Sequence, residues 1–309
     1  MKKIVIAGKA HPVLHETFIK NGFESIYAPS ISRDELLDLL PGLSGLVLAT
    51  RIGADREMIE KGSSLEWIAR LGSGMDHIDT SFATSKNIRC ISSPEGNCQA
   101  VAEHALGMLL SMMNNMCRAN GQIREGQWLR DENRGIELSG KTVGIIGYGH
   151  TGSAFAQLLS SFGVEILAYD KYKFGFGDGR VHEASLEQIG RYADVISFHV
   201  PLTSETAGMA GPAFFDSLQR MPWIINTSRG GVLDEEALLH ALHKGQVRGA
   251  CLDVLENEDL SSLTDLQRQR LERLGNHPAV MLTPHIAGYT EESFYKVSHF
   301  ILQKLGLVV

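Results

Sequence analysis

The chain has 309 residues, of which 43% are hydrophobic and 21% are charged, and its formal net charge is −7. This balance is typical of a globular protein of one or two domains, and the acidic excess argues against a broad nucleic-acid surface. No stretch approaches the roughly 18 apolar residues of a membrane span. The four cysteines lack the paired spacing of zinc sites or small disulfide frameworks: Cys90, Cys98, Cys117 and Cys251. We therefore expect a cytoplasmic protein with reduced thiols and no metal.

Short apolar runs alternate with helical patterns through residues 1–98. A capping box, Ser32 with Glu35 three residues later, opens one of the helices. Such an alternation of strands and helices predicts a parallel sheet. The expected strands are 3–7, 24–28, 46–50, 67–71 and 88–91, and the expected helices are 11–20, 32–40 and 55–61.

A second series of strands follows a long apolar segment. Residues 101–117 predict one long buried helix, and the more polar segment 118–139 carries Trp128. Six strands with helices between them match a doubly wound dinucleotide-binding fold. These strands are expected at 142–146, 164–169, 195–199, 223–226, 247–252 and 280–283. The last helical pattern, about 291–305, has no sheet of its own, so we expect it to pack on the N-terminal part.

A glycine-rich turn, Gly147-Tyr148-Gly149-His150-Thr151-Gly152, links the strand at 142–146 to a helical segment. The three glycines allow the tight turn, the close approach of a pyrophosphate and close packing of helix on strand. The helix N-terminus favours the anion. Asp170 follows Gly147 by 23 positions (170 − 147), close to the roughly 20 expected for a ribose-binding carboxylate. NAD is therefore favoured, although Lys171 leaves NADP open.

Several later segments carry a family resemblance. They are 226–234 (NTSRGGVLD), 252–258 (LDVLENE), 283–288 (TPHIAG), 71–79 (LGSGMDHID), 101–104 (VAEH) and 199–203 (HVPLT). Over essentially its whole length the chain resembles the D-isomer-specific 2-hydroxyacid dehydrogenase family. The resemblance implies a smaller flavodoxin-like α/β catalytic domain, residues 1–98 and 286–309, into which a Rossmann-type NAD-binding domain, residues 99–285, is inserted. It also implies a cleft between the domains and a homodimer formed through residues 101–139.

The resemblance places catalytic roles on Arg229, Glu258 and His285. An imidazole exchanges the hydroxyl proton near neutrality while hydride leaves carbon. A carboxylate behind it fixes the tautomer and stabilises imidazolium, and a guanidinium binds the substrate carboxylate with two hydrogen bonds. The family usually has Pro after this Glu, whereas Asp259 follows here. Glu256 therefore stays a rival to Glu258.

Further binding residues follow from the same motifs. The glycine-flanked Ser73 turn can direct N–H groups at a carboxylate, and the resemblance gives that role to Ser73 and Gly74. Substrate contacts are thus expected from Arg51, Ser73, Gly74, Asn97, Arg229 and His285, with Asn97 near the interdomain hinge. Cofactor contacts are expected from Gly147, Gly149, His150, Thr151, Gly152, Asp170, His199, Pro201, Thr227, Asp253 and Gly288.

These observations predict an NAD-dependent oxidoreductase acting on a D-2-hydroxy acid and its 2-oxo acid. Arg51 and Arg70 suggest a second anionic group, so 3-phospho-D-glycerate is the favoured substrate, as in the family's phosphoglycerate dehydrogenases of serine biosynthesis. The sequence ends at Val309, so we expect a short form without their regulatory domain. Glyoxylate or hydroxypyruvate reduction and lactate-type chemistry stay open, and an NADH-sensing corepressor-like protein is the alternative of another class. Formate dehydrogenase is disfavoured, since that subgroup has Gln at the position of Glu258.

Overall fold

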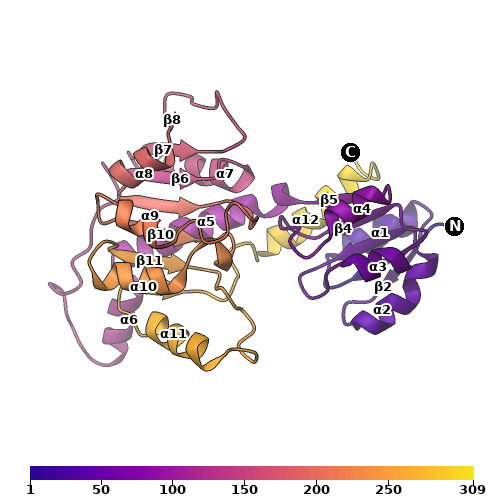
Figure 1. Ribbon diagram of the computed structural model, residues 1–309, viewed down its shortest axis with the longest axis horizontal. Helices are drawn as coiled ribbons and strands as arrows, with labels where there is room; N and C mark the ends of the chain where they lie inside the picture. Colours follow the sequence, from indigo (N-terminus) through magenta and orange to yellow (C-terminus); the bar gives the residue numbers. More distant parts are fainter. The chain divides into compact units, whose positions relative to one another are not determined.

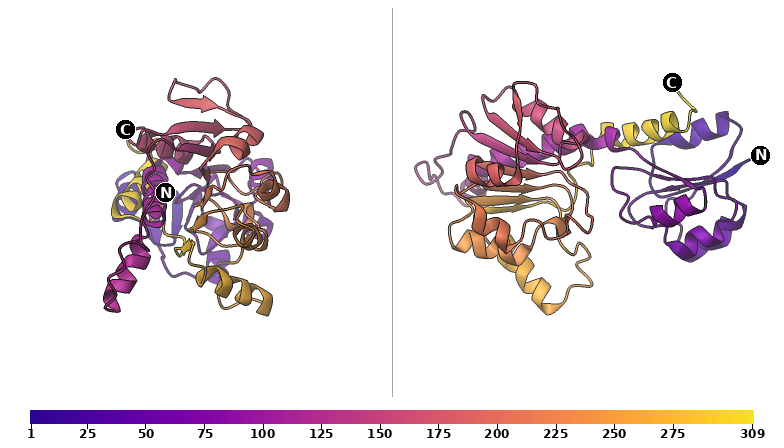
Figure 2. Two further views of the ribbon diagram at one scale, coloured as in Figure 1. Left: turned by 90° about the vertical axis from the view of Figure 1, so that its left-hand side faces the viewer. Right: turned by 45° about the horizontal axis from the view of Figure 1, so that its top comes forward.

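The computed structural model describes residues 1–309, which divide into two compact units. Unit 1 comprises Met1–Cys98 and Tyr289–Val309, and unit 2 comprises Gln99–Gly288. Unit 2 is therefore inserted, along the chain, between the two segments of unit 1. Each unit is built around one parallel sheet with helices packed against it (Figure 1, Figure 2). The predicted α/β fold with two parallel sheets is confirmed.

The sheet of unit 1 has five strands in the order β2-β1-β3-β4-β5, the flavodoxin-like order. Helix α4 was not predicted, because only Ala83 is buried in this short segment. The strands are β1 (Lys3–Ala7), β2 (Glu24–Tyr27), β3 (Gly45–Leu48), β4 (Trp67–Arg70) and β5 (Arg89–Ser92). The helices are α1 (Pro12–Lys20), α2 (Arg33–Leu39), α3 (Arg56–Lys61), α4 (Thr80–Ser85) and α12 (Glu291–Lys304), with the 3-10 turn η1 (Leu40–Gly42).

Apolar clusters cover both faces of this sheet. Side chains alternate along a strand, so Val5 belongs to the cluster beneath α2 and α3, while Ile4 and Ile6 belong to the cluster beneath α1. Helix α12 adds Ile301 and Leu302 to the second cluster and packs beside α1. The C-terminal helix therefore covers the sheet of unit 1, as its sequence predicts. The expected capping box at Ser32 and Glu35 is present at the start of α2.

The sheet of unit 2 has seven parallel strands in the order β12-β11-β10-β9-β6-β7-β8. Successive strands are added on one side of β6 as far as β8 and on its other side from β9 onward. Counted from β6, this is the Rossmann order with one added strand. Its strands are β6 (Thr142–Ile146), β7 (Glu165–Tyr169), β8 (Val181–Glu183), β9 (Val195–Phe198), β10 (Trp223–Asn226), β11 (Gly249–Leu252) and β12 (Val280–Leu282). Six strands were predicted. The seventh, β8, was missed because it has three residues, of which only Val181 is buried.

Helices cover both faces of the unit 2 sheet, as a doubly wound fold requires. One apolar cluster joins α5 and α7 to alternate strand residues such as Val143 and Ile145, and another joins α8, α9 and α10 to residues such as Ile146 and Ile196. The helices are α5 (Pro94–Met113), α6 (Met116–Arg124), α7 (His150–Leu159), α8 (Leu186–Tyr192), α9 (Pro212–Ser217), α10 (Glu235–His243) and α11 (Asp265–Gly275), with the 3-10 turn η2 (Gly230–Val232).

The single helix expected at 101–117 is wrong at both ends. Helix α5 begins at Pro94 and ends at Met113, and α6 begins at Met116. Proline is favoured in the first helical turn, where its missing N–H costs nothing. Between the helices, Asn115 has φ 54°, a left-handed conformation that Asn tolerates better than most residues. Helix α5 is the longest, and neither it nor any other helix combines the length and apolar character that a membrane span requires.

Candidate active site

The glycine-rich turn joins β6 to α7 with little room for side chains. Gly147 has φ +97°, and a Cβ there would lie 2.7 Å from the carbonyl oxygen of His199. A Cβ on Gly152 would lie 2.0 Å from the carbonyl oxygen of Gly147, whereas a Cβ on Gly149 would meet nothing within 4 Å. Gly149 is the N-cap of α7 and no side chain caps this helix. The turn therefore combines open space with an uncapped helix N-terminus, the arrangement that receives a pyrophosphate.

The carboxylate of Asp170 is fixed beside this turn, directly after β7. Its Oδ2 accepts a hydrogen bond from the Tyr148 amide at 2.9 Å, and its Oδ1 accepts from the amides of Tyr172 and Lys173 at 2.9 and 3.1 Å. Unlike Asp170, the neighbouring Lys171 is engaged elsewhere, since its Nζ lies 2.5 Å from Oε1 of Glu205. Lys171, the cation because of which the sequence leaves NADP open, is thus paired with the carboxylate of Glu205.

Two buried polar atoms near the carboxyl ends of β9 and β10 lack a hydrogen-bond partner: Nδ1 of His199 and Oγ1 of Thr227. The other ring nitrogen of His199 lies 2.8 Å from Oγ of Ser197, and burial lowers the pKa of this histidine to about 4. Buried polar atoms without partners are rare in proteins. Together with the open turn at Gly149, they fit a dinucleotide lying along this edge of the sheet.

The remaining expected cofactor residues lie in helix α7 or in loops of the same unit. His150 and Thr151 form the first turn of α7, and Pro201 follows β9, where its carbonyl accepts a hydrogen bond from Oγ1 of Thr206 at 2.6 Å. Gly288 is the last residue of unit 2.

His285 and Glu258 form a direct pair. The distance between His285 Nδ1 and Glu258 Oε2 is 2.8 Å, and both side chains are partly exposed. Burial would raise the pKa of the Glu258 carboxyl, but the hydrogen bond and charge of His285, with smaller contributions from the Leu255 amide and Arg229, hold it below its ordinary value. A charged carboxylate in this position accepts a hydrogen bond from Nδ1 of the imidazole. It therefore favours the neutral tautomer whose proton is on Nδ1 and whose Nε2 is unprotonated.

Arg229 follows β10 and lies in the loop next to this pair. Its Nη1 donates to the carbonyl of Ser228 at 2.7 Å, and its own carbonyl accepts from Nδ2 of Asn226 at 2.9 Å. A Cβ on the adjacent Gly230 would lie 1.8 Å from the carbonyl oxygen of Leu255. Only glycine therefore lets the loop after β10 pack against the loop after β11, which carries Glu258.

The buried carboxylate of Asp253 holds the loop of His285. It accepts hydrogen bonds from the amides of Ile286 and Ala287 at 2.9 and 2.8 Å, and from Oγ1 of Thr283 at 2.5 Å. The carbonyl of Asp253 also accepts from the His285 amide at 2.8 Å. These contacts explain why residues 286–288, expected in the N-terminal domain, belong to unit 2.

This hydrogen bonding fixes a strained backbone. His285 has φ +54°, a conformation that costs about 1–3 kcal/mol for a residue other than glycine. Sequence reasoning missed two residues of the network, Thr283 and His104, although both lie in the motifs described above. Nε2 of His104, on α5, lies 3.1 Å from Oγ1 of Thr283 and 3.7 Å from Oδ1 of Asp253. His104 and Thr283 are 179 positions apart, so local sequence patterns do not reveal their contact.

Glu256, the rival to Glu258, has other partners. Its Oε2 lies 2.6 Å from Nη1 of Arg270, and its Oε1 accepts from the Glu235 amide at 3.1 Å. In turn, the Glu256 amide donates to Oε1 of Glu235 at 2.8 Å. These contacts tie the loop after β11 to α10 and α11. Of the two carboxylates, only Glu258 lies against the imidazole.

Three of the expected substrate residues of unit 1 lie in its strand-end loops, and the fourth, Asn97, lies in helix α5. Ser73 is exposed and Gly74 half-buried in the loop after β4, which is anchored where the Gly72 amide donates to Oγ of Ser93 at 3.1 Å. Arg51, beyond β3, is exposed and donates to the carbonyl of Ile31. Asn97 lies in the first turn of α5, and its buried Oδ1 has no hydrogen-bond partner. No hydrogen bond joins these four residues to one another.

A model of the D-isomer-specific 2-hydroxyacid dehydrogenase NAD-binding domain matches residues 106–287, more than half of the chain. The chain belongs to the D-isomer-specific 2-hydroxyacid dehydrogenase family. Within this family of dehydrogenases, the matched segment is the NAD-binding domain, and it contains the glycine-rich turn, Arg229, Glu258 and His285.

Individual members of the family align along most of the chain. It is 37% identical over 277 residues to the hydroxypyruvate reductase of Thermotoga maritima, covering 89% of this chain and 88% of the relative. It is 33% identical over 313 residues to the D-3-phosphoglycerate dehydrogenase of Archaeoglobus fulgidus, and this alignment covers 98% of this chain and 56% of the relative. A solved D-lactate dehydrogenase from Aquifex aeolicus, complexed with NAD and lactic acid, has a TM-score of 0.85 at 25% identity, covering 98% and 94%. The chain spans about half the length of the phosphoglycerate dehydrogenases it matches.

Proposed function

We propose that this protein catalyses reversible hydride transfer between NAD(H) and a D-2-hydroxy acid/2-oxo acid pair, with His285 as the acid and base. The Glu258–His285 pair in the same unit as the dinucleotide turn carries this proposal. With Nδ1 held by Glu258, Nε2 is the atom that gives a proton to the carbonyl oxygen in reduction and takes it from the hydroxyl in oxidation. Arg229 binds the substrate carboxylate and polarises the adjacent carbonyl.

The cofactor supplies the hydride when bound, and the residues around the turn hold it. The α7 N-terminus and the amides at Gly149–Gly152 bind the pyrophosphate, and Asp170 accepts from the ribose hydroxyls. Asp170 repels a 2′-phosphate, and Glu205 neutralises Lys171, the cation that would attract one. Both features favour NAD over NADP. His199, Pro201, Thr227, Asp253 and Gly288 complete the proposed contacts.

We further propose 3-phospho-D-glycerate as the substrate, oxidised to 3-phosphohydroxypyruvate as the first step of serine biosynthesis. In unit 1, Ser73 and Gly74 offer N–H groups to the carboxylate, Arg51 offers a guanidinium to the phosphate, and Asn97 offers its amide. The names of relatives support two substrates, since a phosphoglycerate dehydrogenase and a hydroxypyruvate reductase both align along most of the chain. Hydroxypyruvate, glyoxylate and lactate-type substrates are therefore the alternatives.

A substrate panel tests this choice. Values of kcat/KM are measured with NADH and with NADPH for phosphohydroxypyruvate, hydroxypyruvate, glyoxylate and pyruvate. The proposal predicts the highest kcat/KM for phosphohydroxypyruvate with NADH. The kcat/KM for hydroxypyruvate should be lower by about tenfold or more, because hydroxypyruvate lacks the phosphate that contacts a cation. Equal values with and without the phosphate would exclude the phosphorylated substrate, and no turnover of any oxo acid would contradict the dehydrogenase itself.

We also propose a homodimer formed through residues 101–139, which comprise most of α5, α6 and the arm that follows it, with the protein located in the cytoplasm. No residue of α6 is buried, and Met116, Ile123 and Trp128 are all more than half exposed. An exposed apolar set of this kind favours association. All four cysteines are free thiols, which suits a reducing compartment. Light scattering at micromolar concentration should give twice the monomer mass, and a monomer would contradict the proposal.

A further inference from the structure

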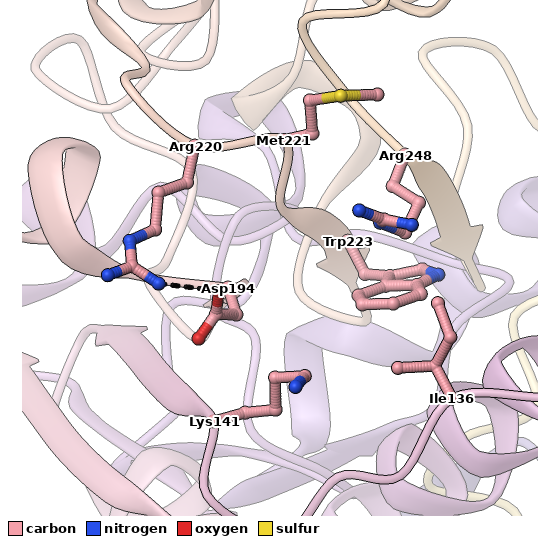
Figure 3. A pocket seen from close by; sticks show the side chains of 7 residues that line it. All are labelled: Ile136, Lys141, Asp194, Arg220, Met221, Trp223 and Arg248. Atoms are coloured by element: carbon pink, nitrogen blue, oxygen red, sulfur yellow. Dashed lines mark hydrogen bonds and ion pairs between the residues drawn. The ribbon is translucent and has the colours of Figure 1, made fainter.

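A pocket lies in unit 2 at the amino ends of its central strands. Lys141 directly precedes β6, Asp194 precedes β9, Trp223 begins β10 and Arg248 precedes β11 (Figure 3). The cavity has a volume of about 380 Å³, within the usual range for small-molecule sites. The cofactor turn and the residues of the candidate active site follow the carboxyl ends of these same strands. The pocket is therefore separate from the dinucleotide site.

The pocket carries an excess of positive charge in an acidic protein. Three cations line it, Lys141, Arg220 and Arg248, against one carboxylate, Asp194. That carboxylate is already used twice: its Oδ1 lies 3.0 Å from Nη1 of Arg220, and its Oδ2 accepts from the Thr142 amide at 2.9 Å. No ion pair neutralises Lys141 or Arg248. Two uncompensated cations therefore face the cavity, although the chain has a net charge of −7.

The Arg248 side chain is held in place by its packing on Trp223. Its guanidinium carbon lies 5.0 Å from the ring centroid of Trp223, and that indole is only 5% exposed. A guanidinium stacked on a buried aromatic ring loses little freedom on binding and keeps its N–H edge available. The backbone is also fixed, since the Arg248 amide donates to the carbonyl of Pro222 at 3.0 Å.

Lys141 and the Arg248–Trp223 pair border the same hollow, while Arg220 turns to Asp194 on the other side (Figure 3). Ile136, which belongs to the segment 101–139 proposed for the homodimer, and Met221 supply apolar contacts on the remaining walls. The cavity volume of about 380 Å³ is more than ten times the roughly 30 Å³ occupied by one water molecule, so a bare phosphate would fill only part of it.

We propose that this pocket binds a small organic phosphate monoester. The phosphate lies between Lys141 and Arg248, whose two charges match a dianion, and the organic part contacts Ile136 and Met221. The proposal is independent of the dehydrogenase activity, because it uses none of the residues assigned to cofactor or substrate.

Calorimetric titration of the full chain, saturated with NAD, with phenyl phosphate tests this site. We expect saturable binding with a Kd of about 1 mM or tighter, from the affinity per atom of small ligands. Lys141→Gln and Arg248→Gln should each weaken binding by about tenfold, whereas Lys141→Arg and Arg248→Lys keep the charge and should keep most of the affinity. Inorganic phosphate should bind more weakly, and phenol should not bind.

Arg191→Gln is the matched control, because Arg191 also stacks on an aromatic ring of unit 2, Tyr192, at 5.4 Å but lies outside the pocket. It should leave the affinity unchanged. Two results would overturn the proposal: no saturable binding of phenyl phosphate, or equal affinities in the Lys141→Gln, Arg248→Gln and Arg191→Gln variants. Thermal melts of each variant verify that it is folded. If a glutamine variant is not folded, the charge-preserving variants Lys141→Arg and Arg248→Lys decide the question.

Discussion

Nδ1 of His285 lies 2.8 Å from Oε2 of Glu258, although the two residues are 27 positions apart. The loop after β11 carries the carboxylate and the loop after β12 carries the imidazole. Asp253, directly after β11, joins the two loops because its carboxylate also accepts hydrogen bonds from the amides of Ile286 and Ala287. The strand ends thus bring together a carboxylate and an imidazole whose contact is not evident from local sequence alone.

Glu258→Gln should lower kcat for reduction by about 10- to 100-fold, because a neutral amide does not stabilise the imidazolium. The pKa of Glu258 is lowered despite its partial burial, chiefly by His285. The carboxylate therefore stays charged to a lower pH than an ordinary glutamate does, and activity that depends on it is lost at a correspondingly lower pH. The variant should shift this acidic limb of the pH profile of kcat/KM.

Glu256→Gln is the control for that experiment, since Glu256 pairs with Arg270. It should keep the wild-type pH profile while reducing stability modestly. A normal profile in Glu258→Gln with an altered profile in Glu256→Gln would transfer the role to Glu256.

Asp253→Asn should destabilise the protein by about 2–4 kcal/mol, because the amide replaces a buried carboxylate that accepts three hydrogen bonds. The strained loop of His285 should also move, lowering kcat at saturating NADH by about 100-fold. Urea unfolding and steady-state kinetics measure both effects. Thr283→Val, which removes only one donor, should cost about 1 kcal/mol. Wild-type kcat in Asp253→Asn would show that Asp253 does not position the loop.

The cofactor preference should depend on Glu205 as well as Asp170. Glu205→Gln leaves Lys171 without its carboxylate partner, so kcat/KM for NADPH relative to NADH should rise several-fold, and Asp170→Ser should raise this ratio by about tenfold or more. Glu165→Gln, at an exposed acid of the same unit that lies 3.6 Å from His182, should leave the ratio unchanged. An unaltered ratio in Asp170→Ser would contradict the ribose contact.

Buried His199 should make the protein less stable in mild acid. Burial lowers its pKa to about 4 from an ordinary 6.5, so the unfolded chain binds this proton more tightly than the folded protein. The free energy of unfolding therefore has its full value above the pKa that His199 has in the unfolded chain, 6.5, and falls as the pH drops from 6.5 towards 4. Between pH 7.5 and 5 the loss from this group is about 2 kcal/mol. In His199→Gln, urea unfolding should show that much less dependence on pH, and an unchanged dependence would contradict the assignment.

Most of the fold could be predicted from the sequence, because short buried strands are contiguous apolar runs. Strands β1, β6 and β10 begin and end where the apolar runs do. The sequence did not predict helix α4, strand β8 or the break between α5 and α6. Strand β8 is held in place by pairing with β7 rather than by its own hydrophobic pattern, and the break between α5 and α6 depends on the left-handed backbone of Asn115.

The site was predictable only where a local motif encodes it. The glycine turn and Asp170 follow a fixed spacing, and the individual segments of Arg229, Glu258 and His285 match family motifs. Spatial choices were not predictable. The choice between Glu256 and Glu258 depends on which carboxylate Arg270 binds, and the neutralisation of Lys171 depends on Glu205, which is 34 positions away. Contacts between distant loops have no period or spacing in the sequence.

The most direct test of the proposed chemistry is the turnover of His285→Ala, with NADH affinity measured on the same preparation. The account predicts that kcat falls by about 10²–10⁴-fold while the Kd for NADH changes little, since the dinucleotide contacts lie elsewhere. His285→Asn, which tolerates the left-handed backbone at this position, should lose as much turnover and so exclude a backbone effect. Near-wild-type kcat in both variants would contradict the assignment of His285 as acid and base.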